Sequence, residues 1–443
     1  MTDKRGIGTL VNDQVEMTSS CFDYFRPIIP ENIMLGSTTL ELNPSTTESP
    51  YEFQIPRDPE QFTDLTLTRI SGLIKCVKLN AVTRAVEAWT NDDHISVCNL
   101  LPHSLFKQVE VLVENTQVND SSTTTYPYKA FIECALSYGN DAKNTHLKSA
   151  GWEKDTAGSE DVAGAANLGW SIRRPKFIGN DFYFNMKLHC DFLHTMKYLP
   201  PGISITLRLI RGDDSFSFIA DDTFTSLARV EISKLKLQYT RIRTEPSFTK
   251  TILNNMTKNP ALFPLTQSKI RTFLINSGID RITFPNIYTE TLPKTVIIGF
   301  LDRRAINGDI KFNPFKFNHH NVNLLNLMIN NIPYHPSRPF QPDYDSGDFM
   351  REYINLFEET GMKQGNNVVE INFTDFKNNC NWYAYDLTPD KCNQEHAHAA
   401  RQGNISIEVG FKTAPAENLY MMVYTTHRQT IEIDHQKNVT VHD

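Results

Sequence analysis

The sequence predicts an all-β protein made of two tandem jelly rolls, each an eight-stranded β-sandwich with one short helix in a connection between strands. Three observations predict this fold: short runs of alternating polar and apolar residues, two isolated amphipathic segments, and an internal repeat of roughly 200 residues. The chain has 443 residues, of which 40% are hydrophobic and 21% charged, so it can bury a sizeable core.

Alternating runs are the dominant signal along the chain. In residues 109–113, Val109, Val111 and Val113 alternate with Glu110 and Leu112. Residues 203–209 and 231–239 follow the same pattern, and a period of two is typical of a strand with one buried face. A similar richness in Val, Ile, Tyr and Phe predicts further strands at residues 65–79, 182–188, 295–301, 368–373, 405–411 and 419–425.

The first helical segment covers residues 127–138. Pro127 suits a first helical turn, and Gly139 suits the position that ends a helix. The apolar residues recur at spacings of three and four, which predicts a short amphipathic helix; they are Phe131, Cys134, Ala135 and Tyr138.

The second helical segment, residues 345–360, repeats this design. Asp345 or Ser346 can cap its first turn, and Gly361 can end it. Its apolar stripe is formed by Phe349, Tyr353, Leu356 and Phe357.

Each helix follows a similar strand and turn, which indicates a duplication. Val109 superposes on Leu325 at an offset of 216 residues, and the two helix-ending glycines superpose at an offset of 222. Residues 203–205 superpose on residues 405–407, an offset of 202. The order of strand, Asn-containing turn, helix, long loop and two strands is kept, as in a diverged tandem repeat. The alternative is two unrelated β-domains whose short motifs match by chance.

Prolines and asparagines between residues 245 and 264 interrupt the β-pattern and predict a linker. The expected organisation is an N-terminal arm at residues 1–43, a first jelly roll at 44–244, the linker at 245–264 and a second jelly roll at 265–443. Residues 139–181 and 306–321 are expected to be long loops, which either project and interlock or serve as ordinary surface connections.

The arm is expected either to dock on a neighbouring chain or inner-wall protein, or to pack under its own first domain. Its apolar residues lie among prolines and are Phe22, Tyr24, Phe25, Ile28, Ile29 and Ile33.

The charge balance argues against a protein whose main task is to coat phosphate. Lys and Arg number 44 against 51 Asp and Glu, which gives a net charge of -7, and residues 1–20 hold Lys4 and Arg5 against three acidic residues. Seven cysteines without a CxxC pair predict reduced, mostly buried thiols, and hence folding in the cytosol or nucleus. No stretch approaches the ~18 apolar residues that span a bilayer, and residues 1–20 lack a signal-peptide core.

Eleven short motifs carry a resemblance to a known family. In order along the chain, they are HSLFKQV (103–109), YPYKA (126–130), LSYG (136–139), KLHCDF (187–192), GISI (202–205), LPKTVIIG (292–299), NPFKF (313–317), RPFQP (338–342), YDLTPD (385–390), RQGN (401–404) and IEID (431–434). Their conjunction resembles the double jelly-roll major capsid proteins of Polinton (Maverick) elements and the related adintoviruses.

This resemblance implies a structural protein of a virion and not an enzyme. Three chains would form a pseudo-hexameric homotrimer, and many such capsomers would tile an icosahedral shell around a double-stranded DNA genome. The expected partners are further copies of the chain, neighbouring capsomers, and penton and minor capsid proteins. Strong direct binding of nucleic acid is not expected, and a membrane partner is left open. The resemblance supplies no catalytic residue, metal site or cofactor.

Two other function classes are weighed against this one: a tandem jelly-roll carbohydrate binder and a bicupin-like metal enzyme. His396 and His398, together with His319 and His320, are candidate metal ligands, but an H-x-H pattern alone is weak evidence for a metal site. No phosphate loop, nucleophile elbow or HExxH motif occurs. Carboxylates at Asp302, Asp213 and Asp214, with Arg303 and Arg304, are expected to be solvated, and Trp152, Trp170 and Trp382 are either sugar platforms or loop anchors.

Overall fold

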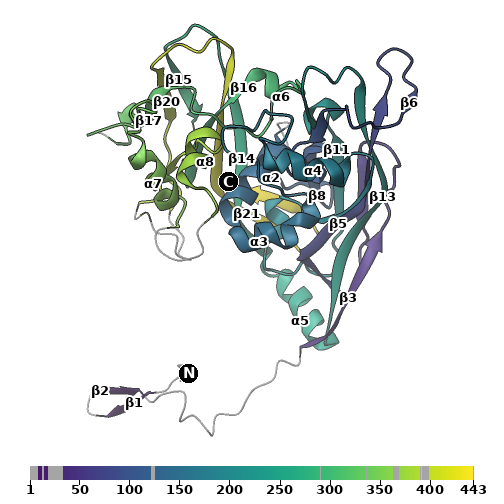
Figure 1. The fold of residues 1–443 in the computed structure, drawn as a ribbon. Coiled ribbons are helices and arrows are strands. Elements are labelled where there is room, and N and C mark those ends of the chain that lie inside the picture. The colour runs from purple at the N-terminus through teal and green to yellow at the C-terminus, as the bar shows by residue number, and fades with distance from the viewer. Residues whose placement is uncertain are drawn as a thin grey trace.

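The computed structural model describes residues 8–11 and 14–17 as strands, and residues 33–120, 125–289, 291–335, 337–362, 369–389, 391 and 399–442 in full. Figure 1 shows the strands of the two halves standing side by side, with helices gathered on the side that faces the viewer. Near the N-terminus, β1 (Gly8–Val11) pairs with β2 (Gln14–Met17). Within the described residues, no helix is long and apolar enough to cross a membrane.

The first half forms a sandwich of two antiparallel sheets, called the first roll below. Its sheets have the orders β10-β5-β13-β3 and β4-β11-β8-β9, with β6 (Val86–Glu87) added to β5 and a separate pair of β7 (Ile95–Val97) and β12 (Phe218–Ala220). The main strands are β3 (Met34–Leu42), β4 (Tyr51–Ile55), β5 (Phe62–Leu79), β8 (Phe106–Val113), β9 (Thr116–Gln117), β10 (Asp181–Met186), β11 (Ile205–Arg211) and β13 (Leu227–Thr244).

The second half forms a second sandwich, the second roll. Its sheets have the orders β14-β21-β16-β19 and β15-β20-β17-β18, with β22 (Val439–His442) added to β21. The main strands are β14 (Ala261–Ile275), β15 (Arg281–Tyr288), β16 (Thr295–Asp302), β17 (Val322–Ile329), β18 (Ile332–Pro333), β19 (Tyr383–Asp386), β20 (Ile405–Phe411) and β21 (Leu419–Ile433).

Both rolls have the same topology, which confirms the predicted double jelly roll. If the eight main strands of each roll are numbered in chain order, one sheet reads 1-8-3-6 and the other 2-7-4-5 in both rolls. The hairpin turns also correspond: Glu114 and Asn115 adopt positive φ after β8, and Asn330 and Asn331 do so after β17, at the predicted offset of 216.

One predicted offset needs a correction of two residues. Val113 pairs with Ile205 in the first roll, and the equivalent Ile329 pairs with Ile405 in the second, so the offset of these strands is 200 rather than 202. Because the side-chain period of a strand is two, a shift of two residues keeps every side chain on the same face, and the sequence pattern could not detect it.

The two expected helices lie in corresponding connections, between the fifth and sixth strands of each roll. They are α2 (Tyr126–Ser137) and α7 (Met350–Glu359). The expected caps are wrong for α7, because its N-cap is Phe349 and no side chain caps it. Gly139 is extended and does not make a left-handed cap, whereas Gly361 has a φ of 86°.

Several connections contain helices that the alternation did not reveal. The segment 139–181, expected to be a loop, contains α3 (Asn140–Asn144), the 3-10 turn η2 (His146–Ala150) and α4 (Leu168–Phe177). The predicted strand at 368–373 is wrong for the described residues, because α8 (Phe373–Asn378) begins there with a capping box between Asn372 and Asp375. Shorter turns are α1 (Leu101–Ser104), η3 (Asp191–His194), η4 (Asp214–Ser217) and α6 (Arg303–Ile306).

The predicted division into arm, domains and linker stays a prediction, although its borders carry regular structure. In the segment assigned to the linker, α5 (Pro246–Met256) starts behind a Glu245 cap, and β14 begins at Ala261. In the segment assigned to the arm, β3 pairs with β13 at the edge of the first roll. The apolar arm residues before Ile33 lie outside the described residues.

The equivalent sheets of the two rolls differ in burial. In β13, exposed Glu231 and Ser233 precede an alternation in which Leu235, Leu237 and Tyr239 face the core of the first roll. In β16, every residue from Val296 to Leu301 is buried. The second roll therefore has a sheet that is covered on both faces. A strand in such a sheet has a continuous apolar run in its sequence instead of an alternating pattern.

Candidate functional site

An aromatic cluster joins the two rolls at α2. Phe131 of α2 stacks on Phe315, with ring centroids 4.6 Å apart and planes inclined by 10°. The Trp382 ring contacts the Phe131 ring edge to face, with the ring centroids 6.2 Å apart. Tyr128, one turn earlier, contacts Phe315 and Phe317 edge to face. Residues from both halves therefore share one continuous core, and this contact between the rolls is called the joint below.

Buried charges form a second layer of the joint. Lys129 Nζ lies 2.7 Å from Asp191 Oδ2, which also accepts a hydrogen bond from the backbone N–H of Ser268 on β14. Glu133 Oε2 lies 2.7 Å from His189 Nδ1, and Tyr424 of β21 donates to Glu133 Oε1 at 3.3 Å. Both carboxylates of this cluster, which pair with cations of the first roll, thus accept hydrogen bonds from groups of the second roll.

Mutual attraction within this cluster outweighs the cost of burial. Burial alone would raise the pKa of Glu133, but the nearby Lys129 and His189 have the larger effect and hold this pKa below its ordinary value. Burial alone would lower the pKa of His189, but its contacts with Cys134 and Glu133 have the larger effect and raise this pKa above its ordinary value. The carboxylate and the imidazolium are therefore both charged at neutral pH, and the cluster is electrically balanced.

A third contact passes through a fully buried arginine. Arg173 of α4 pairs with Asp155 at 2.6 Å, and the other oxygen of Asp155 accepts from the Asn313 side chain of the second half at 3.0 Å. Lys316 pairs with Asp161 at 2.6 Å. Asp155 and Asp161 of the first half are thus each paired with a polar group of the second half, as buried charges require.

One arrangement at the joint resembles a catalytic triad. Cys134 Sγ lies 3.3 Å from His189 Nε2, whose Nδ1 faces Glu133. Sequence reasoning missed it, because Cys134 and His189 lie 55 positions apart and join only in the fold. Cys134 has no exposed surface, and the neighbouring cavity is only about 30 Å³, roughly the volume of one water. The thiol is therefore sealed from any substrate.

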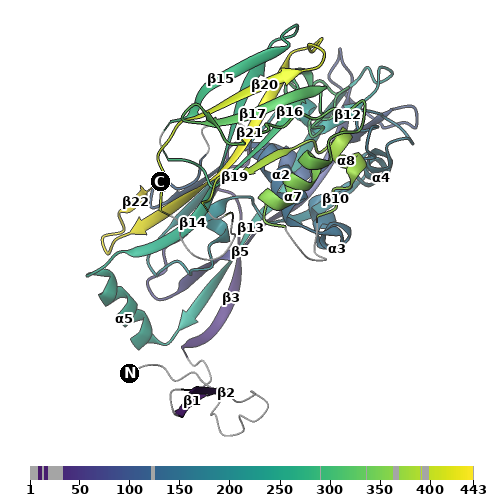
Figure 2. The ribbon, with the colours of Figure 1, turned by 90° about the vertical axis from the view of Figure 1, so that its left-hand side faces the viewer.

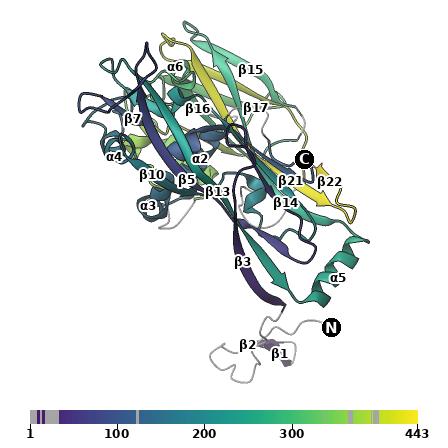
Figure 3. The same cartoon turned by 90° about the vertical axis from the view of Figure 1, so that its right-hand side faces the viewer.

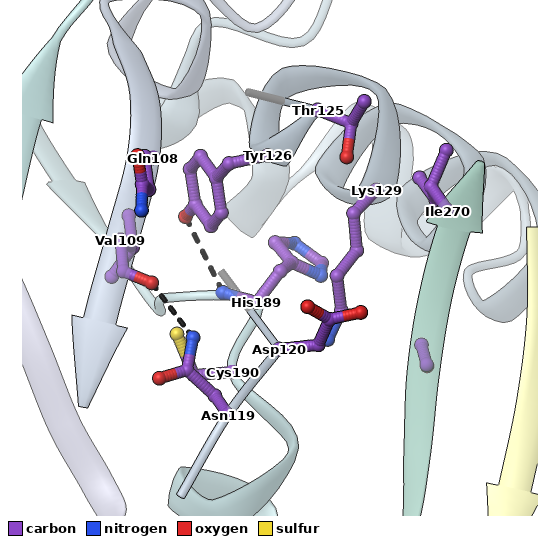
Figure 4. Close-up of a pocket in the computed structure, with 11 residues that line it drawn as sticks. Gln108, Val109, Asn119, Asp120, Thr125, Tyr126, Lys129, His189, Cys190 and Ile270 are labelled. Atoms are coloured by element: carbon purple, nitrogen blue, oxygen red, sulfur yellow. Dashed lines mark hydrogen bonds between the residues drawn. The ribbon is translucent and has the colours of Figure 1, made fainter. Parts of the chain in front are cut away.

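Figure 4 shows this small cavity between β8, α2 and β14. Lys129 descends from α2, and Ile270 stands across from it on β14. The Tyr126 hydroxyl, at 3.4 Å, accepts a hydrogen bond from the backbone N–H of His189, and it lies 3.0 Å from His103 Nδ1. The cavity belongs to the packing of the joint.

The histidines weighed as metal ligands are not brought together in the described part of the chain. His319 stacks on Tyr344, and its Nδ1 accepts from the backbone N–H of Asn321 at 2.9 Å. Burial lowers the pKa of His319 and of His320 to about 4. His396 and His398 lie outside the described residues, and no group of three or more His, Cys, Asp or Glu elsewhere in the described chain can hold a metal ion.

The charged residues weighed as acid–base groups have local structural roles. Asp302 caps α6 by accepting from the backbone N–H of Arg304 at 2.8 Å, and it pairs with the Arg304 guanidinium. Asp214 pairs with Arg211, while Asp213 precedes η4 and is exposed. Arg303 begins α6 beside this pair.

The three tryptophans are anchors and not exposed platforms for sugars. Trp170 donates from Nε1 to the Ile219 carbonyl at 3.0 Å, and Trp152 stacks on Phe131 at 5.9 Å. Trp382 lies fully buried in the joint. The five cysteines in the described residues are free and buried, which agrees with the expected reduced thiols, and burial raises the pKa of Cys98 and Cys380 to about 12.

Among the described residues, two surfaces on opposite sides of the molecule are not covered by other parts of the chain (Figure 2 and Figure 3). On the second roll, a groove of about 490 Å³ runs beside α7, and we call it the α7 groove. On the first roll, the outer face of sheet β10-β5-β13-β3 is the face that points away from the core of that roll. It bears Leu73, Lys75, Tyr183, Glu231 and Ser233.

Comparisons with known proteins show the same fold in viral capsid proteins. No model of a protein family matches the chain. An uncharacterized protein of Caenorhabditis elegans is 23% identical over 420 residues, which cover 90% of this chain and 94% of the relative. A chain in the structure of the Sputnik virophage has a TM-score of 0.65 at 11% identity, covering 97% of this chain and 93% of its own length.

Two further solved structures are similar over nearly the whole chain. The mavirus major capsid protein has a TM-score of 0.58 at 9% identity, with 98% of this chain and 96% of the other covered. The Faustovirus major capsid protein has a TM-score of 0.56 at 10% identity, with 91% of each chain covered. At these identities, the likeness shows the double jelly-roll fold.

Proposed function

We propose that this protein is a major capsid protein, a structural subunit that self-associates into a virion shell. The single observation that carries the proposal is the match of both rolls, over 91% or more of the chain, to chains of known capsids. The internal duplication supports it, because two similar rolls in one chain allow three chains to place six similar sandwiches around one axis.

The finer assignment is a homotrimeric, pseudo-hexameric capsomer that tiles an icosahedral shell around double-stranded DNA. The sequence motifs support the Polinton or adintovirus type within this fold. Penton and minor capsid proteins would be further partners, and synthesis would take place in the host cytoplasm or nucleus. The domain units of this proposal are residues 44–244 and 265–443.

The proposal includes no enzymatic activity and no direct condensation of the genome. The triad-like Cys134, His189 and Glu133 lie inside the joint, where Glu133 accepts a hydrogen bond from Tyr424 of the second roll and Cys134 has no exposed surface. The chain has a net charge of -7, and its first 20 residues are not basic. These residues therefore do not offer a cationic arm for binding duplex DNA. Tight DNA binding that weakens steeply with salt would contradict this part.

Electron microscopy of the purified full-length chain tests the proposal. At high protein concentration, we expect particles of hexagonal outline and closed shells. A population that stays monomeric at all salt and protein concentrations would overturn the capsid role, as would turnover of a substrate by the purified protein.

A further inference from the structure

A cluster of three carboxyl groups and two cations lies where the segment before α4 contacts the second half of the chain. Asp155 pairs with Arg173 at 2.6 Å, and Asp161 pairs with Lys316 at 2.6 Å. The third carboxyl group, that of Glu160, shares Lys316 at the longer distance of 3.8 Å. Since two cations face three carboxyl groups, this cluster is electrically neutral only when one carboxyl group holds a proton.

Glu160 is the member of the cluster that is most costly to ionise. Its side chain has no exposed surface, whereas those of Asp161 and Lys316 are 29% and 23% exposed. Glu160 Oε1 accepts a hydrogen bond from the backbone N–H of Gly158 at 2.8 Å, but Oε2 is buried without a hydrogen-bond partner in the part of the chain that the structure describes. An ionised carboxylate in such a place has a desolvation cost that the neutral acid avoids.

The titratable groups around Glu160 come from both halves of the chain. Burial is the main cause that raises the pKa of Glu160 to about 7, and Asp155 raises it further, while Lys316 lowers it. Cys380 of the second half also lies near, and burial raises the pKa of its thiol to about 12, so this thiol stays neutral. Glu160 is thus the group whose charge we expect to change near neutral pH.

The backbone of Glu160 belongs to the contact between the two halves. The Asn313 side chain donates to the Glu160 carbonyl at 3.3 Å and to Asp155 Oδ2 at 3.0 Å, and the Asn313 backbone N–H donates to Asp161 Oδ1 at 2.8 Å. Asn167, which caps α4, donates to the same Glu160 carbonyl at 3.1 Å. A negative charge on Glu160 therefore arises within the segment that ties α4 to the second half.

We propose that Glu160 is a proton-controlled latch: its neutral acid keeps residues 155–167 closed on residues 313–316, and its ionisation opens this contact. The inference goes beyond the proposed function, because it concerns the single chain whether or not that chain assembles. The closed latch holds the Glu160 proton more tightly than a solvated carboxyl group does. The contact is therefore firmest below about pH 4.5 and weakens as the pH rises, until the closed latch loses its proton near pH 7.

Hydrogen exchange of the full-length chain tests the latch. After correction for the intrinsic pH dependence of exchange, the opening constant of residues 155–167 and 313–316 should rise by up to roughly tenfold per pH unit between about pH 5 and 7. Above about pH 7, it should level off. Glu160→Gln, which keeps a neutral side chain of the same shape, should remove this dependence. Glu48→Gln, at an exposed glutamate, is the matched control and should keep it.

Two further variants separate the titration of Glu160 from a merely structural role. Asp161→Asn removes a neighbouring negative charge and frees Lys316 for Glu160, so the pH at which opening levels off should fall by about one unit. Lys316→Met removes the cation, so this pH should rise. Opening that is independent of pH in wild type, a pH dependence that persists in Glu160→Gln, or shifts of the same sign in the two further variants would each overturn the inference. These results do not depend on self-association, which tests the proposed function separately.

Discussion

The sheet β10-β5-β13-β3 of the first roll and the sheet β14-β21-β16-β19 of the second roll have equivalent strand orders but different surroundings. In the second roll, this sheet packs on one side against its own partner sheet and on the other against the first roll, so β16 is buried from Val296 to Leu301. In the first roll, the outer face remains polar around Lys75 and Glu231. The difference teaches that a duplicated unit can keep its fold while one copy of each surface becomes core and the other remains available for association.

The largest effect is expected from breaking the apolar part of the joint. Phe131→Ala removes a ring that stacks on Phe315 and Trp152 and meets Trp382 edge to face. Because the lost contacts belong to a closely packed core, the free energy of unfolding should fall by about 3–5 kcal/mol. Urea denaturation measures this loss. A loss below about 1 kcal/mol would show that the two rolls do not share one core.

The charged layer of the joint should be nearly as sensitive. Lys129→Met removes the cation that pairs with Asp191 at 2.7 Å and lies 3.7 Å from Glu133, and uncompensated buried charge costs about 3 kcal/mol. Lys129→Arg, which keeps the charge, is the control. Equal urea midpoints for the two variants would contradict the role assigned to this charge.

Glu160 should make the joint sensitive to pH. Its carboxyl is fully buried near Lys316, and burial raises its pKa to about 7. The folded protein therefore binds this proton more tightly than the unfolded chain does. The resulting stabilisation is complete below about pH 4.5 and is lost as the pH rises through about 7.

Glu160→Gln keeps the shape of the side chain and removes this titration. The variant should be more stable than wild type at pH 8, by up to about 3 kcal/mol, and the gain should shrink toward pH 5. Unfolding curves across this range measure the difference. Parallel pH profiles for the two proteins would show that Glu160 does not titrate near neutrality.

The smallest effect on stability is expected on the outer face. Tyr183→Ala removes an exposed ring whose neighbour is Lys234, so the free energy of unfolding should change by less than about 0.5 kcal/mol. A loss comparable to that of Phe131→Ala would mean that the outer face supports the fold of the single chain.

The sequence predicted those parts of the fold that local patterns encode. Alternation located strands such as β8 and β20, and the turns at Asn115 and Asn331 revealed the duplication. The sequence pattern did not reveal the helix α5, because Pro246 interrupts a strand pattern and equally suits the first turn of a helix. The strand expected near residue 370 gave way to α8, whose capping box settled the local conformation.

The joint itself could not be predicted from the sequence. Its partners are far apart along the chain: Tyr424 reaches Glu133 across 291 positions, and Lys154 reaches Asp375 across 221. No local period or spacing specifies such pairs, which arise only when two rolls pack. The sequence pattern did contain one trace of the joint, the unbroken apolar run of residues 296–301, which is typical of a strand buried on both faces.

Sedimentation equilibrium of the full-length wild-type chain tests self-association, the central claim, most directly. The account predicts a species of three times 50.7 kDa, about 152 kDa, that dissociates to the 50.7 kDa monomer on dilution. A mass that stays at 50.7 kDa at every protein concentration and ionic strength would contradict it.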